Sequence, residues 1–362
     1  MRVLHIGLCK NKGGIESFAI NYFRVMQPLG VIFDFVDIYG EGLAYADEIE
    51  RLGGKIIPLV SFKKNPIRCK NMLKAYMKSN NYDAVHIHVQ TTAYIFPITA
   101  AIAAGVKPIV HVHFAAVRGV LRKILHAINI RRLRRLDIVR LSCAAAGGRW
   151  FWGEREFSVL PNAINAEAFA FDNDKRRRIR EELSLAEDDV VLGFVGRLEP
   201  VKNPFFALEV IEKCKQRGLK TKLLMLGDGN LKTEIQKRIS EKGLSDSVEL
   251  IGHTPRVSEI LSAMDIYLMP SFSEAFSISA IEAQTNGLPV LFSDRLSREM
   301  QILQNCRFIK LDADSFAAAI EKTRAENREG ASEGILESIY NISHACEELL
   351  KIYEKSEAGA KV

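Results

Sequence analysis

The sequence lacks the features that place a protein in an oxidising compartment or across a bilayer. Its six cysteines are scattered, with no C-x-x-C pair and no spacing typical of metal ligands. This distribution argues against a disulfide framework and a zinc site, and it fits a reducing cytosol. The longest apolar stretch, residues 93–106, is interrupted by Pro97 and Gly105 and is shorter than the roughly 18 residues that a membrane span needs.

The amino-terminal segment MRVLHIGLCKNKGG contains too short an apolar run for a secretory signal. With 362 residues, of which 48% are hydrophobic and 26% are charged, the chain is long enough for two globular domains. We therefore expect a cytoplasmic protein, either free or peripheral at the inner face of the membrane.

The net charge of +6 is unevenly distributed. Basic residues gather between Arg118 and Arg140 and in the run KRRRIR at residues 175–180. Such a surface serves nucleic acid, anionic lipid or a phosphorylated substrate. The first segment has no interleaved aromatic residues, so we expect no nucleic-acid partner.

Apolar residues accompany the basic ones in the first segment at approximately helical spacing: Leu121, Ile124, Leu125, Ile128, Leu133 and Leu136. The pattern predicts either a helix that rests on an anionic membrane surface or a core-packing helix with a solvated basic face. Both interpretations stay open from the sequence.

Short β-rich runs alternate with longer helical patterns twice along the chain. Seven strand candidates in the first half are residues 3–7, 33–39, 55–59, 84–89, 109–114, 138–143 and 158–160. Six more in the second half are residues 190–196, 222–227, 248–252, 265–270, 289–292 and 308–311. Several are apolar on both faces, as buried parallel strands must be. The alternation predicts an α/β fold of two doubly wound, Rossmann-like units.

The pattern breaks at the stretch PNAIN, residues 161–165, which we take as the domain boundary. The predicted domains are 1–165 and 166–335, followed by a helical segment at 336–362 whose final residues from Ser356 onward are expected to be disordered. Open α/β sheets bind ligands outside the carboxyl ends of their strands. The expected site is therefore a cleft between the two units.

Glycines follow the first predicted strand, in the motif Lys12-Gly13-Gly14-Ile15-Glu16. They let a backbone approach a ligand closely, and the helix start behind them favours negative charge. The motif is not G-x-G-x-x-G, so a dinucleotide oxidoreductase is poorly supported. The alternative is an ordinary tight turn, as it is for Gly227 in the triplet GDG.

Two cations follow the strand at 190–196, in the sequence GRLEPVKNP. Arg197 offers a planar fork for phosphate oxygens and Lys202 a compact charge. Together they would neutralise a diphosphate without a metal ion, whereas the alternative is a solvated basic loop.

Two carboxylates lie eight positions apart in SEAFSISAIEAQ, where a buried strand leads into a helix. Free amides at a helix start attract anions. Glu274 and Glu282 would repel a phosphate unless each accepts hydrogen bonds from neutral hydroxyls, as those of a sugar or ribose do. The implied ligand is a nucleotide-sugar. Ordinary charge complementing the helix dipole is the alternative.

Histidines alternate in two strand candidates, as His86 and His88 and as His111 and His113. Alternation puts both members of a pair on one face of the sheet, so metal binding is conceivable. No third ligand is evident in the sequence, and we expect core histidines and no metal. His113, at the carboxyl end of its strand, could still reach the site and contact a reacting sugar.

These motifs, in this order along the whole chain, resemble those of the retaining glycosyltransferases of family 4, and in particular members that build bacterial exopolysaccharides and capsules. The resemblance implies the GT-B architecture, in which two Rossmann-like domains face a cleft and the final helix crosses back to the first domain. It also implies a nucleotide-sugar donor held by the second domain, an acceptor on the first, and no metal or other cofactor.

The resemblance assigns a role to each motif residue. Glu274 would bind the donor sugar and Glu282 the ribose, while Arg197 and Lys202 hold the diphosphate together with the amides of Phe276, Ser277 and Ile278. His113 would lie beside the anomeric carbon. Gly13, Gly14, Glu16 and Gly227 would line the donor or acceptor. The family usually has glycine where this chain has Ala275 and Ala163, and often at Ser277, which leaves the path of the loop open.

The expected activity is transfer of a hexose-type sugar from a nucleoside-diphosphate sugar, with UDP the expected nucleotide, to a hydroxyl of a glycan or lipid-linked acceptor in cell-surface polysaccharide synthesis. Two alternatives remain open from the sequence. One is a non-catalytic, glycosyltransferase-like partner subunit, and the other is a nucleotide-sugar epimerase on the same fold.

Overall fold

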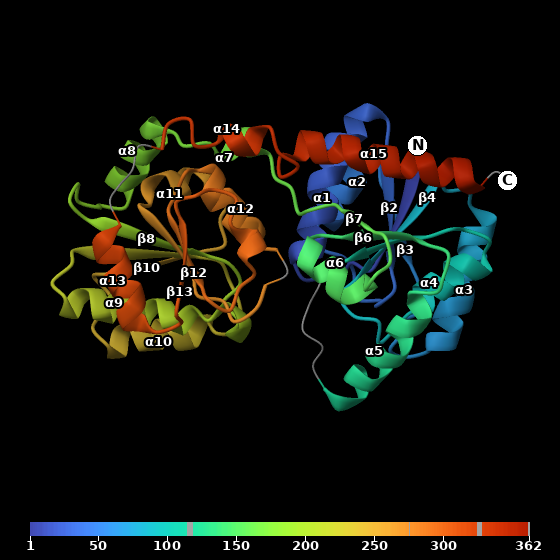
Figure 1. Ribbon diagram of the computed structural model, residues 1–362, viewed down its shortest axis with the longest axis horizontal. Helices are drawn as coiled ribbons and strands as arrows, with labels where there is room; N and C mark the ends of the chain where they lie inside the picture. Colours follow the sequence, from blue (N-terminus) through green and yellow to red (C-terminus); the bar gives the residue numbers. More distant parts are fainter. Residues whose placement is uncertain (114–118, 275, 324–327, 361–362) are drawn as a thin grey trace. The chain divides into compact units, whose positions relative to one another are not determined.

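The computed structural model describes residues 1–113, 119–274, 276–323 and 328–360, and the chain divides into two compact units (Figure 1). The first unit comprises Met1–Ala163 and Ile339–Val362, and the second comprises Ile164–Ser338. The sequence predicts the division after residue 165, and the structure has it after Ala163.

The first unit contains a seven-stranded parallel sheet in the order β3-β2-β1-β4-β5-β6-β7. Its strands are β1 (Arg2–Ile6), β2 (Ile32–Asp37), β3 (Ile56–Pro58), β4 (Ala84–Val89), β5 (Ile109–Val112), β6 (Val139–Ser142) and β7 (Ser158–Val159). Apart from the short β3 and β7 and the first half of β6, these strands are mostly buried, because helices cover both faces of the sheet.

The helices of this unit are α1 (Gly14–Met26), α2 (Ala46–Arg51), α3 (Pro66–Ser79), α4 (Phe96–Ala103), α5 (Val120–Leu133), α6 (Ala145–Trp152) and α15 (Ile342–Ala360). A short 3₁₀ helix, Gln27–Leu29, extends α1. Residues of α1 and α15 share one core cluster, and residues of α3, α4 and α6 share another. The sheet therefore separates two hydrophobic cores.

Helix α15 belongs to the first unit although the second unit precedes it in sequence (Figure 1). Its residues Ile342, Cys346, Leu349 and Tyr353 are buried in the core that α1 also fills. The predicted return of the final helix is therefore confirmed. The predicted disorder from Ser356 is wrong as far as Ala360, because the helix continues to that residue.

The second unit contains a six-stranded parallel sheet in the order β10-β9-β8-β11-β12-β13. Its strands are β8 (Val190–Val195), β9 (Thr221–Leu226), β10 (Val248–Gly252), β11 (Ile266–Met269), β12 (Val290–Ser293) and β13 (Cys306–Ile309). Every strand that the sequence predicts in the two units is present, with ends shifted by at most two residues. The predicted pair of doubly wound parallel-sheet domains is confirmed.

The helices of the second unit are α7 (Ala166–Phe169), α8 (Asn173–Glu182), α9 (Pro204–Gln216), α10 (Lys232–Glu241), α11 (Val257–Ala263), α12 (Ile278–Thr285), α13 (Ala313–Lys322) and α14 (Glu333–Leu336). Two 3₁₀ helices, Pro200–Lys202 and Arg298–Met300, lie in its loops. None of the helices in the described part of the chain combines the length and the hydrophobicity needed to span a bilayer.

The basic run at 175–180 is not a free positive surface. Arg176 and Arg180, both on α8, form ion pairs with Asp265 at 2.6 and 3.3 Å. The other cations of the run each pair with a different acid: Lys175 with Asp172, Arg177 with Asp174 and Arg178 with Glu259. The run therefore fixes α8 to its own domain and leaves little charge for a ligand.

Candidate active site

Both sheets have a topological switch point, where the strand order reverses between two neighbours. In the second unit the reversal lies between β8 and β11, and in the first it lies between β1 and β4. Loops that leave the carboxyl ends of such strands diverge and form a crevice, which is where open α/β sheets bind ligands. The predicted site residues form two groups, one in each unit.

In the second unit the loops after β8 and β11 are joined by hydrogen bonds. The backbone N–H of Phe272 donates to the carbonyl of Val201 at 2.9 Å. The side-chain amide of Asn203 donates to the carbonyl of Pro270 at 3.3 Å. These contacts bring two of the predicted residues, 72 positions apart in sequence, to the same point.

Lys202 and Glu274 meet there, with Nζ of Lys202 2.7 Å from Oε1 of Glu274. The two side chains are 17% and 11% exposed, so the pair is largely withdrawn from water. Oε1 accepts no hydrogen bond of good geometry from any described residue, so its contact with Lys202 is an ion pair. A compact cation and a carboxylate with remaining acceptor capacity are therefore held in place before any ligand arrives.

Arg197 lies elsewhere. Its Nη1 donates to Oε1 of Glu199 at 2.6 Å, and its side chain is 48% exposed. The structure therefore pairs Arg197 with a neighbour in its own loop instead of grouping it with Lys202 and Glu274. The sequence did not single out Glu199, because nothing in GRLEPVKNP distinguishes a pairing acid from a solvated one.

Helix α12 begins at Ile278, four residues after Glu274. Of the three predicted amides, that of Ile278 opens the helix, and those of Phe276 and Ser277 lie just before it. Ser277 precedes the first turn with φ −86° and ψ 122°, and its hydroxyl caps no backbone amide. This is extended backbone that any residue adopts, so serine introduces no backbone strain at this position, where the family that the chain resembles often has glycine. Position 275, the other departure, lies outside the described residues.

Glu282 is one turn further along α12 and is partly buried. Burial raises the pKa of its carboxyl group from 4.5 to about 7. Its carboxylate forms no ion pair with any of the described residues, so no cation among them compensates the loss of water. An acid in this position gains from hydroxyl donors supplied by a ligand.

Tyr267, on β11, is close enough to both acids for their charges to act on it, and it was not anticipated from the sequence. Its hydroxyl donates to the carbonyl of Val195 at 3.0 Å and lies 2.8 Å from Oγ of Ser279. Burial raises its pKa, and the charges of Glu282 and Glu274 add to that rise. Tyr267 thus connects the end of β8 with the first turn of α12.

Gly227 and Gly229 are required by close packing of the loops after β8 and β9. A Cβ on Gly227 would lie 1.9 Å from the carbonyl oxygen of Gly196, and φ is +133°. A Cβ on Gly229 would lie 2.5 Å from the carbonyl oxygen of Leu198. Only glycine fits these positions, so the GDG triplet holds the Arg197 loop in shape whether or not it contacts a ligand.

In the first unit, Gly13 and Gly14 open α1 after the loop from β1. Within the described part of the chain, a Cβ placed on Gly14 would meet no atom of another segment within 4 Å, so these residues leave space beside this backbone. Glu16 is 5% exposed and accepts a hydrogen bond from the backbone N–H of Cys9 at 3.0 Å. Its carboxylate therefore fixes the glycine loop, a role that the sequence does not reveal.

His113 follows β5 and belongs to a cluster of five buried histidines: His5, His86, His88, His111 and His113. The expectation that no third histidine accompanies the pairs is wrong, because His5 on β1 lies beside His86 on β4. The register of β4 and β5 likewise puts His88 opposite His111. A single histidine in RVLHI carries no periodic signal, so strand order was needed to find it.

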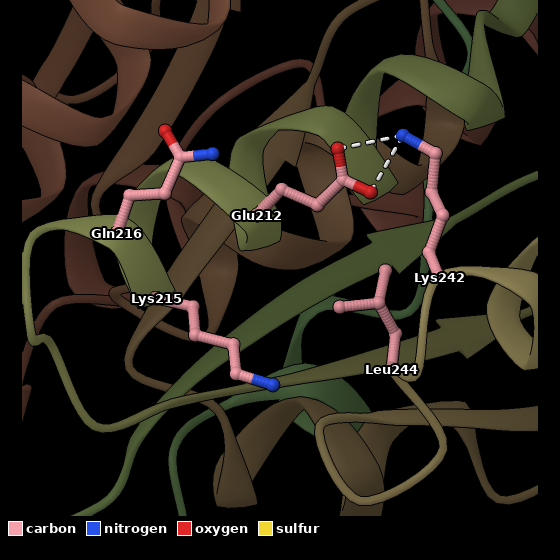
Figure 2. Close-up of a pocket in the computed structure, with 5 residues that line it drawn as sticks. All are labelled: Glu212, Lys215, Gln216, Lys242 and Leu244. Carbon is pink, nitrogen blue, oxygen red and sulfur yellow. Dashed lines mark hydrogen bonds and ion pairs between the residues drawn. The ribbon is translucent and has the colours of Figure 1, made fainter.

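A shallow pocket of about 390 Å³ lies in the second unit between Glu212, Lys215, Gln216, Lys242 and Leu244 (Figure 2). These residues belong to the end of α9 and to the segment before β10. They lie at the amino ends of the strands, the opposite edge of the sheet from Lys202 and Glu274. An ion pair of 2.6 Å between Lys242 and Glu212 occupies the pocket.

Residues 175–330 match the protein family described as "Glycosyl transferases group 1". This segment is a group 1 glycosyltransferase domain. It spans most of the second unit and contains the Lys202–Glu274 pair, the start of α12 and Glu282. The predicted family resemblance is therefore confirmed at the level of the group 1 glycosyltransferases.

Similar proteins extend beyond this segment and cover most of the chain. The "Putative glycosyltransferase EpsF" of Bacillus subtilis is 28% identical over 98% of this chain and 97% of its own. The Escherichia coli "UDP-Gal:alpha-D-GlcNAc-diphosphoundecaprenol alpha-1,3-galactosyltransferase" is 27% identical over 81% of this chain and 79% of its own.

Among solved structures, Anabaena Alr3699/HepE in complex with UDP has a TM-score of 0.80 and 16% identity, covering 98% of this chain and all of that one. The same protein in complex with UDP-glucose has a TM-score of 0.78. At this identity the likeness concerns the fold, which is GT-B.

Proposed function

We propose that the chain is a retaining glycosyltransferase that transfers a hexose-type sugar from a UDP-sugar to a hydroxyl of a glycan or lipid-linked acceptor in cell-surface polysaccharide synthesis. The observation that carries the proposal is the largely buried pair of Lys202 and Glu274 at the switch point of the second sheet. The names of the relatives support the substrate class, since one acts with UDP-Gal and another is named EpsF.

In the proposed reaction the bond between the anomeric carbon and the phosphate oxygen breaks, and its electron pair stays on the diphosphate. Lys202 and the amides at the start of α12 stabilise this charge as it develops. Half-exposed Arg197 exchanges Glu199 for a phosphate oxygen. These groups balance the negative charge of the diphosphate, so we propose that no metal ion is required.

A new bond forms between the anomeric carbon and the acceptor oxygen on the face that the diphosphate leaves, which retains the configuration. The acceptor's proton passes to the departing phosphate oxygen. Glu274 accepts hydrogen bonds from the donor sugar and is held by Lys202, so it is a binding group and not a nucleophile. Glu282 accepts from the ribose hydroxyls, which replace the water that its carboxylate has lost.

The purified protein is to be screened by thermal shift against UDP-, GDP- and ADP-sugars, followed by transfer assays with the donors that bind. We expect a UDP-hexose to raise the melting temperature and to be consumed in the presence of EDTA. NMR of the product is expected to show the donor's anomeric configuration. A protein that neither binds nor turns over any donor would be the non-catalytic subunit, and an absolute need for a divalent cation would contradict the metal-free proposal.

We also propose that α5 rests on an anionic membrane. Its outer face carries the apolar residues Val120, Leu121, Ile124 and Ile128, which are 53–76% exposed. The exposed cations beside them are Arg122, Lys123, Arg131, Arg132 and Arg135. In Figure 1 the helix extends from the edge of the first domain, with its other face packed on that domain through Leu133. An exposed apolar stripe bordered by positive charge fits the boundary of an acidic lipid layer.

Flotation with liposomes that contain acidic phospholipid tests this helix. Replacing Leu121, Ile124 and Ile128 with serine is expected to reduce the bound fraction at least tenfold, and neutralising Arg131, Arg132 and Arg135 should have a similar effect. Arg134 is left intact because it bonds to the carbonyls of Phe151 and Trp150. Ile67→Ser, on an equally exposed isoleucine of α3, is the control. Equal binding by all variants would exclude α5 as the contact.

A further inference from the structure

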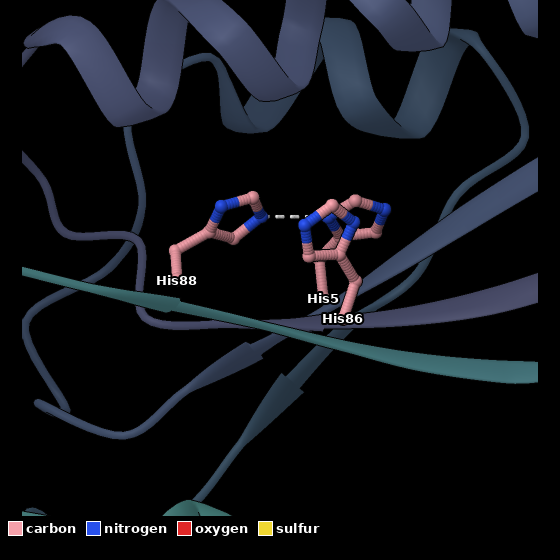
Figure 3. Close-up of side chains that lie close together, drawn as sticks. All are labelled: His5, His86 and His88. Atoms are coloured by element: carbon pink, nitrogen blue, oxygen red, sulfur yellow. Dashed lines mark hydrogen bonds between the residues drawn. The ribbon is translucent and has the colours of Figure 1, made fainter. Parts of the chain in front are cut away.

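The histidine cluster of the first unit is a connected chain of hydrogen bonds. Nδ1 of His88 lies 3.1 Å from Nε2 of His113, and Nε2 of His88 lies 3.0 Å from Nδ1 of His5 (Figure 3). The hydroxyl of Tyr353, on α15, lies 3.4 Å from Nε2 of His5 and 2.8 Å from Nδ1 of His86. The chain therefore runs from His113 through His88, His5 and Tyr353 to His86.

These rings are neutral, because burial lowers the pKa of each histidine, to about 3 for His5 and His113. A neutral imidazole has one N–H and one bare nitrogen, so each link of the chain fixes the next. Two arrangements of the protons, which run in opposite directions, satisfy all the links and also place the Tyr353 hydroxyl proton in a hydrogen bond. In a third, the Tyr353 oxygen accepts from both His5 and His86, and its own buried O–H finds no acceptor among the described residues, so this arrangement is disfavoured.

The far end of the chain distinguishes the two directions. Nε2 of His86 is buried and has no hydrogen-bond partner among the residues that the structure describes. In one direction this atom would carry a buried, unpaired N–H, and in the other it is a bare nitrogen. Unpaired buried donors are the rarer and more costly case. His111 shows the same preference, since its Nε2 donates to the carbonyl of Leu160 at 3.1 Å and its bare Nδ1 is unpartnered.

A bare Nε2 on His86 fixes the position of every other proton in the chain. Nδ1–H of His86 donates to the Tyr353 oxygen, and the Tyr353 hydroxyl donates to Nε2 of His5. Nδ1–H of His5 then donates to His88, and Nδ1–H of His88 donates to Nε2 of His113. His113 is left with its proton on Nδ1.

We propose that Tyr353 is a positioning residue that holds His113 as the Nδ1–H tautomer through His5 and His88, so that His113 meets its ligand as a neutral hydrogen-bond donor. The group opposite Nδ1 must then accept a hydrogen bond, as the oxygen of a sugar hydroxyl does. The identity of that ligand rests on the proposed function, whereas the tautomer does not.

The chain orients a proton and does not conduct one. If His113 gave up its Nδ1 proton, each neighbour would pass one along and His86 would become an imidazolate anion in a buried site. A metal ion fits the cluster less well than the hydrogen bonds do. The two groups of three histidines whose ring nitrogens lie within 4.8 Å of one another contain no carboxylate to balance a divalent charge. In addition, the N···N hydrogen bonds already use the ring nitrogens that face one another.

Long-range ¹H–¹⁵N NMR on the full chain with labelled histidine reports the tautomer of each ring directly. We expect His113 and His88 to show protonated Nδ1 in the unaltered protein and mixed tautomers in Tyr353→Phe, with single His→Gln variants for assignment. Tyr22→Phe is the matched control, because that change also removes a buried tyrosine hydroxyl, one whose hydrogen bond to the carbonyl of Pro161 at 2.9 Å lies outside the chain of rings.

Turnover provides the second readout. Tyr353→Phe is expected to lower kcat about tenfold, a part of what a positioned proton donor contributes, with little change in KM. Tyr22→Phe is expected to leave kcat unchanged. An unaltered NMR spectrum in Tyr353→Phe would overturn the inference, as would stoichiometric Zn²⁺ that chelators remove from the cluster. If Tyr353→Phe leaves the tautomers unchanged, only the inference about Tyr353 is contradicted. If the tautomers are as expected but the protein transfers no sugar, only the proposed function is contradicted.

Discussion

Replacing Lys202 with methionine should lower kcat at least a hundredfold with the best donor, because the side chain stabilises the charge that appears on the leaving diphosphate. Loss of one preorganised group at such a position costs about 10²–10³ in rate. The measurement is initial-rate kinetics at saturating donor. A variant that keeps half of the original turnover would remove Lys202 from the mechanism.

The same substitution should destabilise the second domain. It leaves the carboxylate of Glu274, whose side chain is 11% exposed, without its cation, at a cost of about 2 kcal/mol in the free energy of unfolding. The double variant Lys202→Met, Glu274→Gln should recover most of this stability in urea titrations and none of the activity. That divergence separates loss of chemistry from loss of fold.

Lys242→Met is the matched control for the pair. Lys242 forms an ion pair of 2.6 Å with Glu212, in the pocket of Figure 2 at the other edge of the same sheet. Both of these side chains are more exposed than those of Lys202 and Glu274. We expect kcat to stay unchanged and the unfolding midpoint to shift only slightly.

Glu282→Gln should stabilise the protein at pH 8 and not at pH 4. The folded-state pKa of about 7 lies above the ordinary value of 4.5, so the folded protein holds this proton more tightly than the unfolded chain does. Stability from this group is greatest below about pH 4.5 and declines as the pH rises to 7, where the carboxylate is ionised in its buried position. The upper limit of the difference is about 3 kcal/mol.

Urea unfolding from pH 4 to pH 8 measures this effect as the difference between the original protein and Glu282→Gln. Glu241→Gln, on the exposed face of α10, controls for the general loss of one negative charge. Donor affinity should fall in Glu282→Gln although the protein is more stable, since an amide accepts ribose hydroxyls less well. A difference in stability that does not vary with pH would show that Glu282 is not held in a water-poor site.

The sequence was sufficient for the fold, because the alternation of strands and helices that predicts it is local. Strand candidates, the GRLEPVKNP loop and the SEAFSISAIEAQ segment each follow from short patterns. The pairing of Lys202 with Glu274 agrees with the sequence-based grouping of cations and acids. The pairing of Arg197 with Glu199 does not follow from it, since side-chain choice in an exposed loop depends on local geometry.

The features that sequence reasoning missed depend on which strands are neighbours. His5 joins the other histidines because β1 lies between β2 and β4, and Tyr353 joins them because α15 returns across the sheet. Similarly, the basic run at 175–180 suggests a binding surface, but Asp265 and other acids from distant segments neutralise it. Periodicity in the segment that forms α5 predicted one apolar stripe, but the structure divides it: Leu121, Ile124 and Ile128 are exposed, whereas Leu133 and Leu136 pack into the core.

The return of α15 has a consequence for how the protein is made on the ribosome. The first domain buries Ile342, Leu349 and Tyr353 beneath α1, although its sheet is translated before any residue of the second domain. During synthesis the second domain can complete its core while the first still exposes an apolar face. We expect the nascent amino-terminal domain to depend on chaperones until the ribosome has released α15.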